Sequence, residues 1–353
     1  MRILIITPSL LLGGTERFIM NFAKAFKDSH LIDIAYFRGE DGRVIEQLQM
    51  NVNEIYKFPY YVKAMGRFIK EIHSFFRDNQ YDIVYCHANH TSTILYTFPI
   101  WRSGTQIWYH SHNTNGKNRV LLLVFRRIIL RVCNHLFACS LDAAKYMYGD
   151  VAAQVISNCI ESNEYSFDPY ARNAMRKKFD LTNKIVIGHI GRFSKQKNQT
   201  FLVKIFQEIK KKKSDVCLVL VGDGETKLEV IELIKRLGLE TDVLILDNSV
   251  DVCMYYHMFD VFVLPSLYEG LPFVALEAQA SGTPCLLSDN MDRSVSITPL
   301  VRFKSINDSS YDWATELLSF CEKRDKKNGY SSLIEKSKFG FKNIKQSYAR
   351  VGL

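Results

Sequence analysis

The stretch LPSLYEGLPFVALEA, residues 264–278, leads from a short apolar strand through a glutamate-bearing loop into a helix of almost wholly apolar residues. Pro272 suits the first turn of that helix, because its missing N–H has no intrahelical partner there, and Gly282 suits the C-terminal end. Glu269 then lies in the loop before the helix, and Glu277 lies between one and two turns inside it. Both carboxylates can face a ligand at the helix N-terminus, where free N–H groups and the helix dipole favour a diphosphate.

The sequence neighbours of Glu277 are unusual for a glutamate in a helix. A lone glutamate in an apolar helix usually lies on a solvated face or in a buried salt bridge. The neighbours here are small or apolar: Phe273, Val274, Ala275, Leu276, Ala278 and Ala280. A carboxylate among them is costly unless it accepts hydrogen bonds, which the hydroxyls of a sugar would supply.

On both sides of this stretch, short β-branched runs alternate with helical patterns, which predicts parallel sheets built from βα units. In the second half of the chain we expect strands at Lys184–Ile190, Val216–Val221, Val243–Leu246, Val261–Leu264 and Thr283–Leu287. The helices expected between them include Gln199–Lys212, Lys227–Leu237 and Phe273–Ser281. Glycines cluster after or near the strand ends, where doubly wound sheets bind ligands.

The first half repeats this alternation. We expect strands at Arg2–Thr7, Leu31–Phe37, Ile83–His87, Gln106–His110 and Leu136–Cys139, and a helix whose core face carries Phe18, Phe22 and Phe26. A length of 353 residues favours two domains. The sequence therefore predicts an α/β protein with Rossmann-like domains over 1–165 and 166–335, and a final helix over 336–353 that crosses back to the first domain.

Four further motifs precede the glutamate pair in the sequence: GG at 13–14, HSHN at 110–113, VISNCIE at 155–161 and GRFSKQK at 191–197. In this order, the five motifs closely resemble those of the family 4 glycosyltransferases, and the resemblance covers most of the chain to about residue 305. The family consists of retaining enzymes of the GT-B fold. The resemblance implies two Rossmann-like domains that face an interdomain cleft, and transfer of a hexose or N-acetylhexosamine from a nucleotide diphosphate sugar.

The resemblance also implies roles for individual residues. Arg192 and Lys197 would be the cations of the diphosphate-binding loop, Glu269 would hold the hydroxyls of the donor sugar, and Glu277 would hold those of the ribose. The rest of the expected donor site consists of Gly13, Gly14, Gly270, Leu271 and Phe273.

A histidine near the donor sugar is a further implied group. We expect the alternation of sheet faces to point only one of His110 and His112 at the cleft. We favour His112 as the catalytic group, because Asn113 follows it where the family often has Asp.

A physical argument also supports the assignment of Arg192 and Lys197 as diphosphate-binding cations. A departing nucleoside diphosphate gains negative charge in the transition state, and without a metal this charge must be stabilised by fixed cations and N–H groups. Arg192 offers a rigid fork and Lys197 a point charge on one loop. We therefore expect neither a metal nor a cofactor. The lone Gly222-Asp223-Gly224 is not a dinucleotide-binding GxGxxG motif, and no Walker A sequence is present.

The chain departs from the family's pattern at two places. Cys159 replaces the glycine of the hinge motif, and Asp292-Arg293-Ser294-Val295 stands where many relatives have a glutamate. Two alternatives remain open from the sequence: a nucleotide-sugar epimerase on the same fold, and an inactive partner subunit. By family frequency we expect a UDP-sugar donor, used in polysaccharide or capsule assembly.

The charge distribution suggests where an acceptor binds. The formal net charge is +9, and no acidic residue occurs between Asp82 and Asp142. That interval combines apolar runs with Arg102, Lys117, Arg119, Arg126, Arg127 and Arg131. It could lie on an anionic membrane surface and receive a glycan or a lipid-diphosphate-linked acceptor; the alternative is a core helix whose arginine stems reach outward. Nucleic acid is not an expected partner, since no recognisable binding module is present.

The eight cysteines are scattered through apolar segments without a CxxC pair, which is typical of reduced thiols. The apolar N-terminus is interrupted by Thr7-Pro8-Ser9 and by Gly13-Gly14, unlike a signal peptide. We therefore expect a cytoplasmic protein, with a possible peripheral position on the inner face of the membrane.

Overall fold

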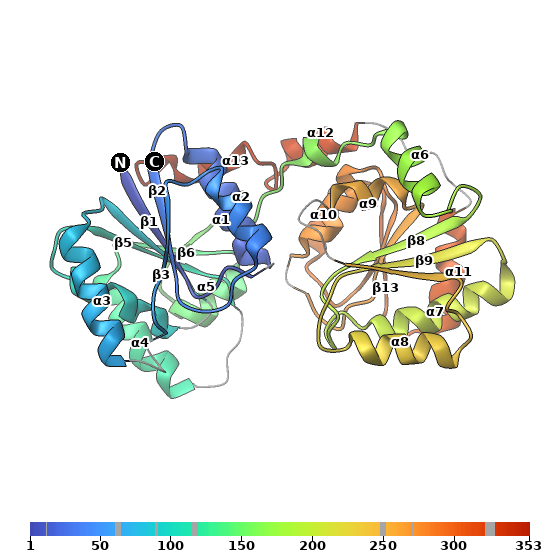
Figure 1. Ribbon diagram of the computed structural model, residues 1–353, viewed down its shortest axis with the longest axis horizontal. Helices are drawn as coiled ribbons and strands as arrows, with labels where there is room; N and C mark the ends of the chain where they lie inside the picture. Colours follow the sequence, from blue (N-terminus) through green and yellow to red (C-terminus); the bar gives the residue numbers. More distant parts are fainter. Residues whose placement is uncertain are drawn as a thin grey trace. The chain divides into compact units, whose positions relative to one another are not determined.

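A computed structural model describes residues 1–11, 13–60, 65–88, 91–113, 119–247, 252–269, 271–321 and 329–353. The chain forms two compact units (Figure 1). Unit 1 comprises Met1–Cys159 together with Phe341–Leu353, and unit 2 comprises Ile160–Gly340.

Unit 1 is built on a seven-stranded sheet in which every pairing is parallel. Its strands are β1 (Arg2–Thr7), β2 (Leu31–Tyr36), β3 (Glu54–Lys57), β4 (Ile83–Ala88), β5 (Gln106–Ser111), β6 (His135–Ala138) and β7 (Gln154–Val155). They follow the order β3-β2-β1-β4-β5-β6-β7. The order reverses between β1 and β4, which makes the carboxyl ends of these two strands the natural ligand-binding edge of the unit.

Helices cover both faces of this sheet. One face packs against α1 (Gly14–Phe26), α2 (Gly42–Gln49) and α13 (Asn343–Ala349). The other packs against α3 (Met65–Asp78), the 3₁₀ segment η1 (Thr91–Ile100), α4 (Arg119–Val132) and α5 (Leu141–Tyr148). The stripe expected from Phe18, Phe22 and Phe26 is buried against the first face, at most 2% exposed.

Unit 2 repeats the plan with six parallel strands. They are β8 (Ile185–Ile190), β9 (Val216–Val221), β10 (Val243–Leu246), β11 (Val261–Leu264), β12 (Cys285–Ser288) and β13 (Val301–Lys304), in the order β10-β9-β8-β11-β12-β13. Here the reversal falls between β8 and β11. Strands β8, β9 and β11 are buried along their whole length, which explains their continuous apolar runs.

One face of this second sheet carries α7 (Gln199–Lys212), α8 (Lys227–Arg236) and α11 (Ser310–Cys321). The opposite face carries η2 (Ser162–Tyr165), α6 (Pro169–Lys178), α9 (Cys253–Met258), α10 (Phe273–Ala280), η3 (Arg293–Val295) and α12 (Tyr330–Lys336). Both units are therefore Rossmann-like three-layer sandwiches, as expected from the sequence.

The expected strands are all present, with ends shifted by at most two residues. The sequence did not predict β3, β7 or β13, which are short strands at the edges of their sheets. β13 lies where a helical region was expected. Pro272 is the N-cap of α10 rather than part of its first turn, and Gly282 ends the helix with φ +69°.

The division between the units also differs from the expected boundaries, because residues 165 and 335 both lie inside unit 2. The N–H of Ile160 donates to the carbonyl of Phe339 at 2.9 Å, and Tyr165 is buried in the core of unit 2. Residues 161–169 therefore belong to unit 2. Helix α13 belongs to unit 1, where the ring of Tyr348 is fully buried.

Candidate active site

Two loops meet at the strand reversal of unit 2. One follows β8 and the other follows β11. They are joined by hydrogen bonds from the Leu267 N–H to the Gln196 carbonyl (2.8 Å), from Gln196 Nε2 to the Tyr268 carbonyl (3.0 Å) and from Asn198 Nδ2 to the Pro265 carbonyl (3.2 Å). These contacts fix the loop of the GRFSKQK motif against the loop that carries Glu269.

Lys197 and Glu269 form an ion pair at this junction, 2.6 Å from Nζ to Oε1. Their side chains are only 16% and 10% exposed. Ser266 Oγ donates to the same carboxylate oxygen at 2.9 Å. A shielded charge pair of this kind interacts more strongly than an exposed one. The structure thus brings together two of the expected site residues, 72 positions apart in the chain.

Arg192 lies on the same loop as Lys197 but in different surroundings. Its Nε lies 3.2 Å from Glu225 Oε2, and the two side chains are 75% and 55% exposed. Such an exposed pair contributes little to stability, so the guanidinium can change partner at little cost. Glu225 directly follows Gly222-Asp223-Gly224, and the sequence analysis gave it no role.

Two glycines let the loop after β9 approach the GRFSKQK loop. Gly222 and Gly224 have φ of +150° and +152°. A Cβ on Gly222 would lie 2.1 Å from the Gly191 carbonyl oxygen, and one on Gly224 would lie 2.2 Å from that of Phe193. These positions need glycine for both backbone conformation and space.

Gly224→Ala is therefore expected to lower the free energy of unfolding of unit 2 by at least about 2 kcal/mol, because strain and a backbone clash add together. Gly238→Ala is the matched control. Gly238 has φ +66° with open space around its Cβ, so the cost there should be about 1 kcal/mol. Urea unfolding of both variants measures the difference, and equal losses would contradict the close approach of the two loops.

Glu277 lies inside α10, where the sequence placed it, and is 2% exposed. Its Oε1 accepts a hydrogen bond from the Tyr165 hydroxyl (3.1 Å), and its Oε2 accepts one from the Tyr256 hydroxyl (2.7 Å). Two tyrosine hydroxyls of the protein therefore donate to the carboxylate, and the sequence analysis did not predict either of them.

The remaining residues of the expected donor site fall in several places. Leu271 and Phe273 are half-buried and pack on the core beside α10. Gly270 lies outside the described residues. In unit 1, Gly13 is the N-cap of α1 and Gly14 is its first residue.

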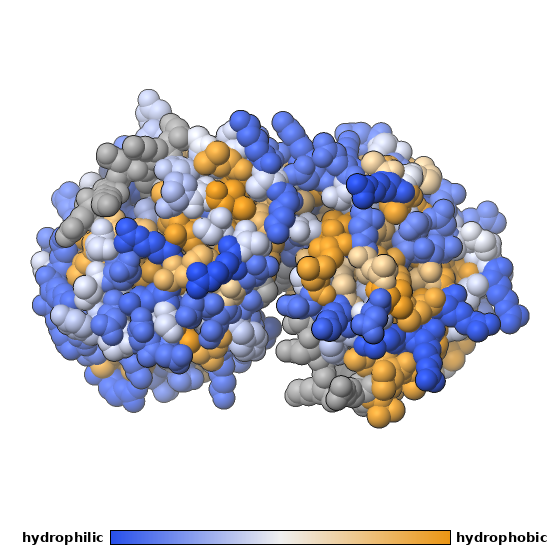
Figure 2. All heavy atoms as spheres, turned by 180° about the vertical axis from the view of Figure 1, so that it is seen from behind, coloured by the Kyte–Doolittle hydropathy of each residue, from blue (hydrophilic) through white to orange (hydrophobic). Residues whose placement is uncertain are grey.

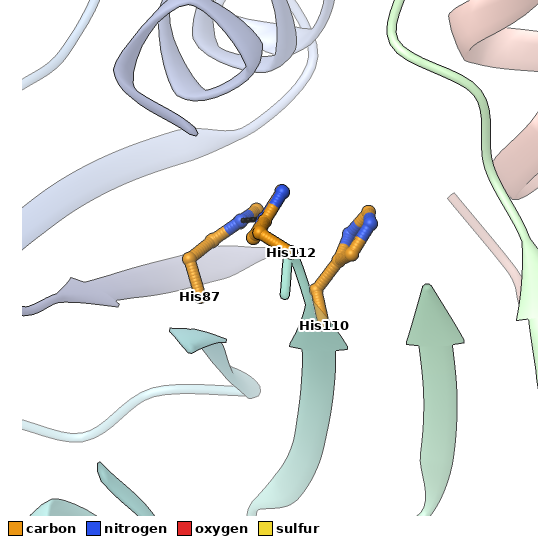
Figure 3. A group of neighbouring side chains, drawn as sticks. All are labelled: His87, His110 and His112. Atoms are coloured by element: carbon orange, nitrogen blue, oxygen red, sulfur yellow. Dashed lines mark hydrogen bonds between the residues drawn. The ribbon is translucent and has the colours of Figure 1, made fainter. Parts of the chain in front are cut away.

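The alternation of sheet faces does not separate His110 from His112 as the sequence analysis expected, because both rings lie on one side. Their rings stack with centroids 4.4 Å apart, and the ring of His87 lies 5.3 and 5.2 Å from them. Figure 3 shows the three side chains gathered on one side. Residues two apart on a strand point to the same face, and His87 is the register partner of His110 on β4. Burial lowers the pKa of His112 to about 3, so its ring is neutral at pH 7.

Glu16, which the sequence analysis did not single out, is a buried carboxyl at the start of α1. It is 7% exposed, and Ser9 Oγ donates to its Oε1 at 3.4 Å. Burial raises the pKa of Glu16 from 4.5 to about 7. Its position three residues after Gly13 is a helix-capping position. The spacing of Glu16 from Gly13 was therefore visible in the sequence, but it suggested a helix cap and not a carboxyl group with a raised pKa.

The raised pKa of Glu16 predicts a pH-dependent stability. The folded chain keeps this proton up to pH about 7, whereas the unfolded chain loses it near pH 4.5, so stability from this group is lost as pH rises between these values. Glu16→Gln should raise the free energy of unfolding at pH 8 by about 3 kcal/mol and change it little at pH 4.5. Urea unfolding at both pH values tests this, with the exposed Glu46→Gln on α2 as the control. A Glu16→Gln gain of equal size at both pH values would contradict the assignment.

Comparison with known proteins gives consistent matches over both units. Residues 171–328 match the glycosyl transferases group 1, and residues 12–164 match Glycosyltransferase Family 4. The chain is 30% identical to the putative glycosyltransferase EpsF of Bacillus subtilis, over 83% of this chain and 80% of the relative. It is 27% identical to the UDP-Gal:alpha-D-GlcNAc-diphosphoundecaprenol alpha-1,3-galactosyltransferase of Escherichia coli, over 65% of this chain and 62% of that protein.

The fold has a close counterpart among solved structures. Alr3699/HepE of Anabaena, in complex with UDP-glucose, superposes with a TM-score of 0.83 at 20% identity and covers 99% of both chains. This likeness concerns the fold.

Proposed function

The chain belongs to the family 4 glycosyltransferases of the GT-B fold, and on this premise we propose that it transfers a hexose or N-acetylhexosamine from a UDP-sugar to a hydroxyl of a lipid-diphosphate-linked saccharide, with retention and without a metal. The proposed setting is polysaccharide biosynthesis, and the name of the Escherichia coli relative, which acts on a diphosphoundecaprenol-linked sugar, supports the lipid-linked acceptor. The partly buried Lys197–Glu269 pair at the strand reversal of unit 2 is the observation that carries the proposal.

Donor binding would exchange the partners of this ion pair. The diphosphate offers Lys197 a stronger negative charge than one carboxylate does, and the sugar hydroxyls offer Glu269 new donors. Arg192 would leave its exposed contact with Glu225 and take up the diphosphate as well. Each charge in the pair would thus be matched before and after binding, so neither is left buried without a partner.

Bond cleavage then builds charge on the leaving phosphate. Lys197, Arg192 and the first N–H groups of α10 would stabilise this charge. The leaving phosphate oxygen would take the proton of the acceptor hydroxyl, which attacks the anomeric carbon on the same face. The new C–O bond replaces the bond to the diphosphate, and the nucleoside diphosphate departs with that proton. The neutral ring of His112 would donate a hydrogen bond to the donor sugar.

The test is a product analysis by NMR with UDP-sugars and an undecaprenyl-diphosphate-linked saccharide, with and without EDTA. We expect a new α-glycosidic linkage that forms equally well with EDTA. Interconversion of the UDP-sugar in the absence of acceptor would identify an epimerase instead. Absence of nucleotide binding in calorimetry would identify an inactive partner.

Helix α4 supports a lipid-linked acceptor, because it exposes apolar residues beside arginines. Val120, Leu121, Leu123 and Val124 are 50–71% exposed, and Arg127 and Arg131 on the same helix are exposed as well. Figure 2 shows apolar side chains at the lower margin of unit 1, where α4 lies in Figure 1. Arg126, by contrast, donates to the carbonyls of Tyr146 and Met147 at the end of α5 and is part of the fold. No helix among the described residues is long and apolar enough to cross a bilayer.

We expect the protein to float with vesicles rich in anionic lipid at low salt. Arg127→Ser with Arg131→Ser should weaken binding by on the order of tenfold, because each arginine near the surface contributes about 1 kcal/mol. Leu123→Ser with Val124→Ser should weaken it through lost apolar contact. Leu228→Ser, an exposed leucine on α8 of unit 2, is the control and should bind as the wild type does. Failure of the wild type to float would remove the membrane from the proposal and leave the transfer reaction standing.

A further inference from the structure

Unit 1 gathers three imidazoles at the carboxyl edge of its sheet. His87 is the register partner of His110, and His112 follows directly after β5. One nitrogen of each residue lies within 4.8 Å of the others (Figure 3). The cluster lies beside the strand reversal between β1 and β4, where ligands bind in sheets of this order.

Two of the buried ring nitrogens have no hydrogen-bond partner among the residues that the structure describes. His110 Nδ1 lies 2.7 Å from the Tyr85 hydroxyl, and His87 Nδ1 lies 2.9 Å from His112 Nε2. The Nε2 atoms of His87 and His110 are buried and have no hydrogen-bond partner within the described part of the chain. Both residues are 0% exposed. A buried polar nitrogen is destabilising without a partner, so two of them side by side indicate that something else binds there.

The chemistry of the cluster selects one class of ligand. A neutral imidazole whose proton is on Nδ1 offers a lone pair at Nε2, and in His87 and His110 this is the atom that has no hydrogen-bond partner within the described part of the chain. Among the described residues no carboxylate or thiol belongs to the cluster. Neutral imidazoles suit Zn²⁺, Cu²⁺ and Ni²⁺, whereas Mg²⁺ and Ca²⁺ require oxygen ligands.

We propose that His87, His110 and His112 bind one divalent transition-metal ion, with Zn²⁺ as the expected ion. His110 would bind through Nε2, while Tyr85 holds its Nδ1 and so fixes the tautomer and the orientation of the ring. Zinc–nitrogen bonds of about 2.0–2.1 Å place the nitrogens of a tetrahedral site roughly 3.3 Å apart. The rings therefore need to turn and bring these nitrogens closer by up to about 1.5 Å to reach that geometry. Solvent can supply the fourth ligand, because His112 is partly accessible.

The inference goes beyond the proposed function and assigns the metal no step in glycosyl transfer. His112 is also the residue proposed to contact the donor sugar, so metal and donor would compete for it. The experiment therefore uses donor-free protein and measures metal binding alone. Its outcome does not depend on whether the chain transfers sugars.

The test is a titration of the chelator-treated full chain, free of any affinity tag, with Co²⁺ as the spectroscopic probe and Zn²⁺ as the competitor. We expect one equivalent of Co²⁺ to produce the intense visible bands of a tetrahedral site, and one equivalent of Zn²⁺ to abolish them. A wild-type chain that produces no such bands overturns the proposal.

Matched variants show whether these histidines are the ligands. His87→Gln and His110→Gln should each weaken Co²⁺ binding at least about 100-fold, and Tyr85→Phe should weaken it about 10- to 100-fold while keeping all three ligands. His73→Gln on α3, whose ring packs on Phe98 outside the cluster, should bind as the wild type does. Unchanged affinity in both cluster variants would place the metal elsewhere and overturn the proposal. If a cluster variant fails to fold, the wild-type titration and the Tyr85→Phe variant still show whether the cluster binds the metal.

Discussion

Lys197→Met is expected to lower kcat/KM for sugar transfer by about 100- to 1,000-fold, the loss seen when one fixed group that stabilises transition-state charge is removed. Methionine is an unbranched side chain one atom shorter than lysine, and it lacks the charged ammonium group and its hydrogen-bond donors. The measurement is a steady-state assay with UDP-sugar and lipid-linked acceptor. The variant also leaves Glu269 without its buried partner, so part of any loss could come from a damaged loop.

The double variant Lys197→Met/Glu269→Gln separates these two causes. Removing both charges relieves the unpaired carboxylate and should recover most of the stability lost in the single variant. Activity should stay low, because neither the phosphate cation nor the sugar-binding carboxylate remains. Recovery of activity together with stability would mean that the pair only holds the two loops together.

Glu277→Ala is expected to weaken binding of UDP by about 10- to 100-fold, since a charged hydrogen-bond acceptor contributes about 1.5–3 kcal/mol. The effect should appear in UDP itself and not only in the UDP-sugar, because this residue is assigned to the ribose. Glu269→Ala should instead lower turnover with little effect on UDP affinity. Calorimetry with UDP and steady-state kinetics distinguish the two variants.

Tyr256→Phe is the control for Glu277. It removes one hydroxyl that contacts the carboxylate and leaves the carboxylate in place. It should lower stability by about 1 kcal/mol and leave UDP affinity nearly unchanged. If Glu277→Ala reduced stability but not UDP affinity, the carboxylate would be a core group held by two tyrosines, and its assignment to the ribose would fail.

The sequence predicted the strands correctly wherever burial produces a recognisable pattern of apolar residues. β8 and β9 are buried on both faces, and their apolar runs gave their bounds to within one residue. β13 is only partly buried, at the edge of its sheet. Its four residues carry no pattern that separates a strand from a helix, which is why a helical region was expected there.

The site shows a similar limit. The resemblance to the family motifs implied that Lys197 and Glu269 serve one ligand, but their direct ion pair depends on how two loops meet. The tyrosine partners of Glu277 come from η2 and α9, which are distant in sequence from α10, and no local sequence pattern predicts these contacts. The common face of His110 and His112 did follow from the two-residue period of a strand and was missed, whereas the place of His87 required the register of β4 and β5.

The last helix of unit 1 has a consequence for how the protein is made. Tyr348 is fully buried, its hydroxyl lies 2.6 Å from that of Tyr85, and its ring packs against Phe22, Trp108 and Phe137. On the ribosome, all of residues 160–340 emerge before this ring does. The nascent chain must therefore carry an open apolar pocket in unit 1 while unit 2 is synthesised, and chaperones that bind exposed apolar surface would meet it during that interval.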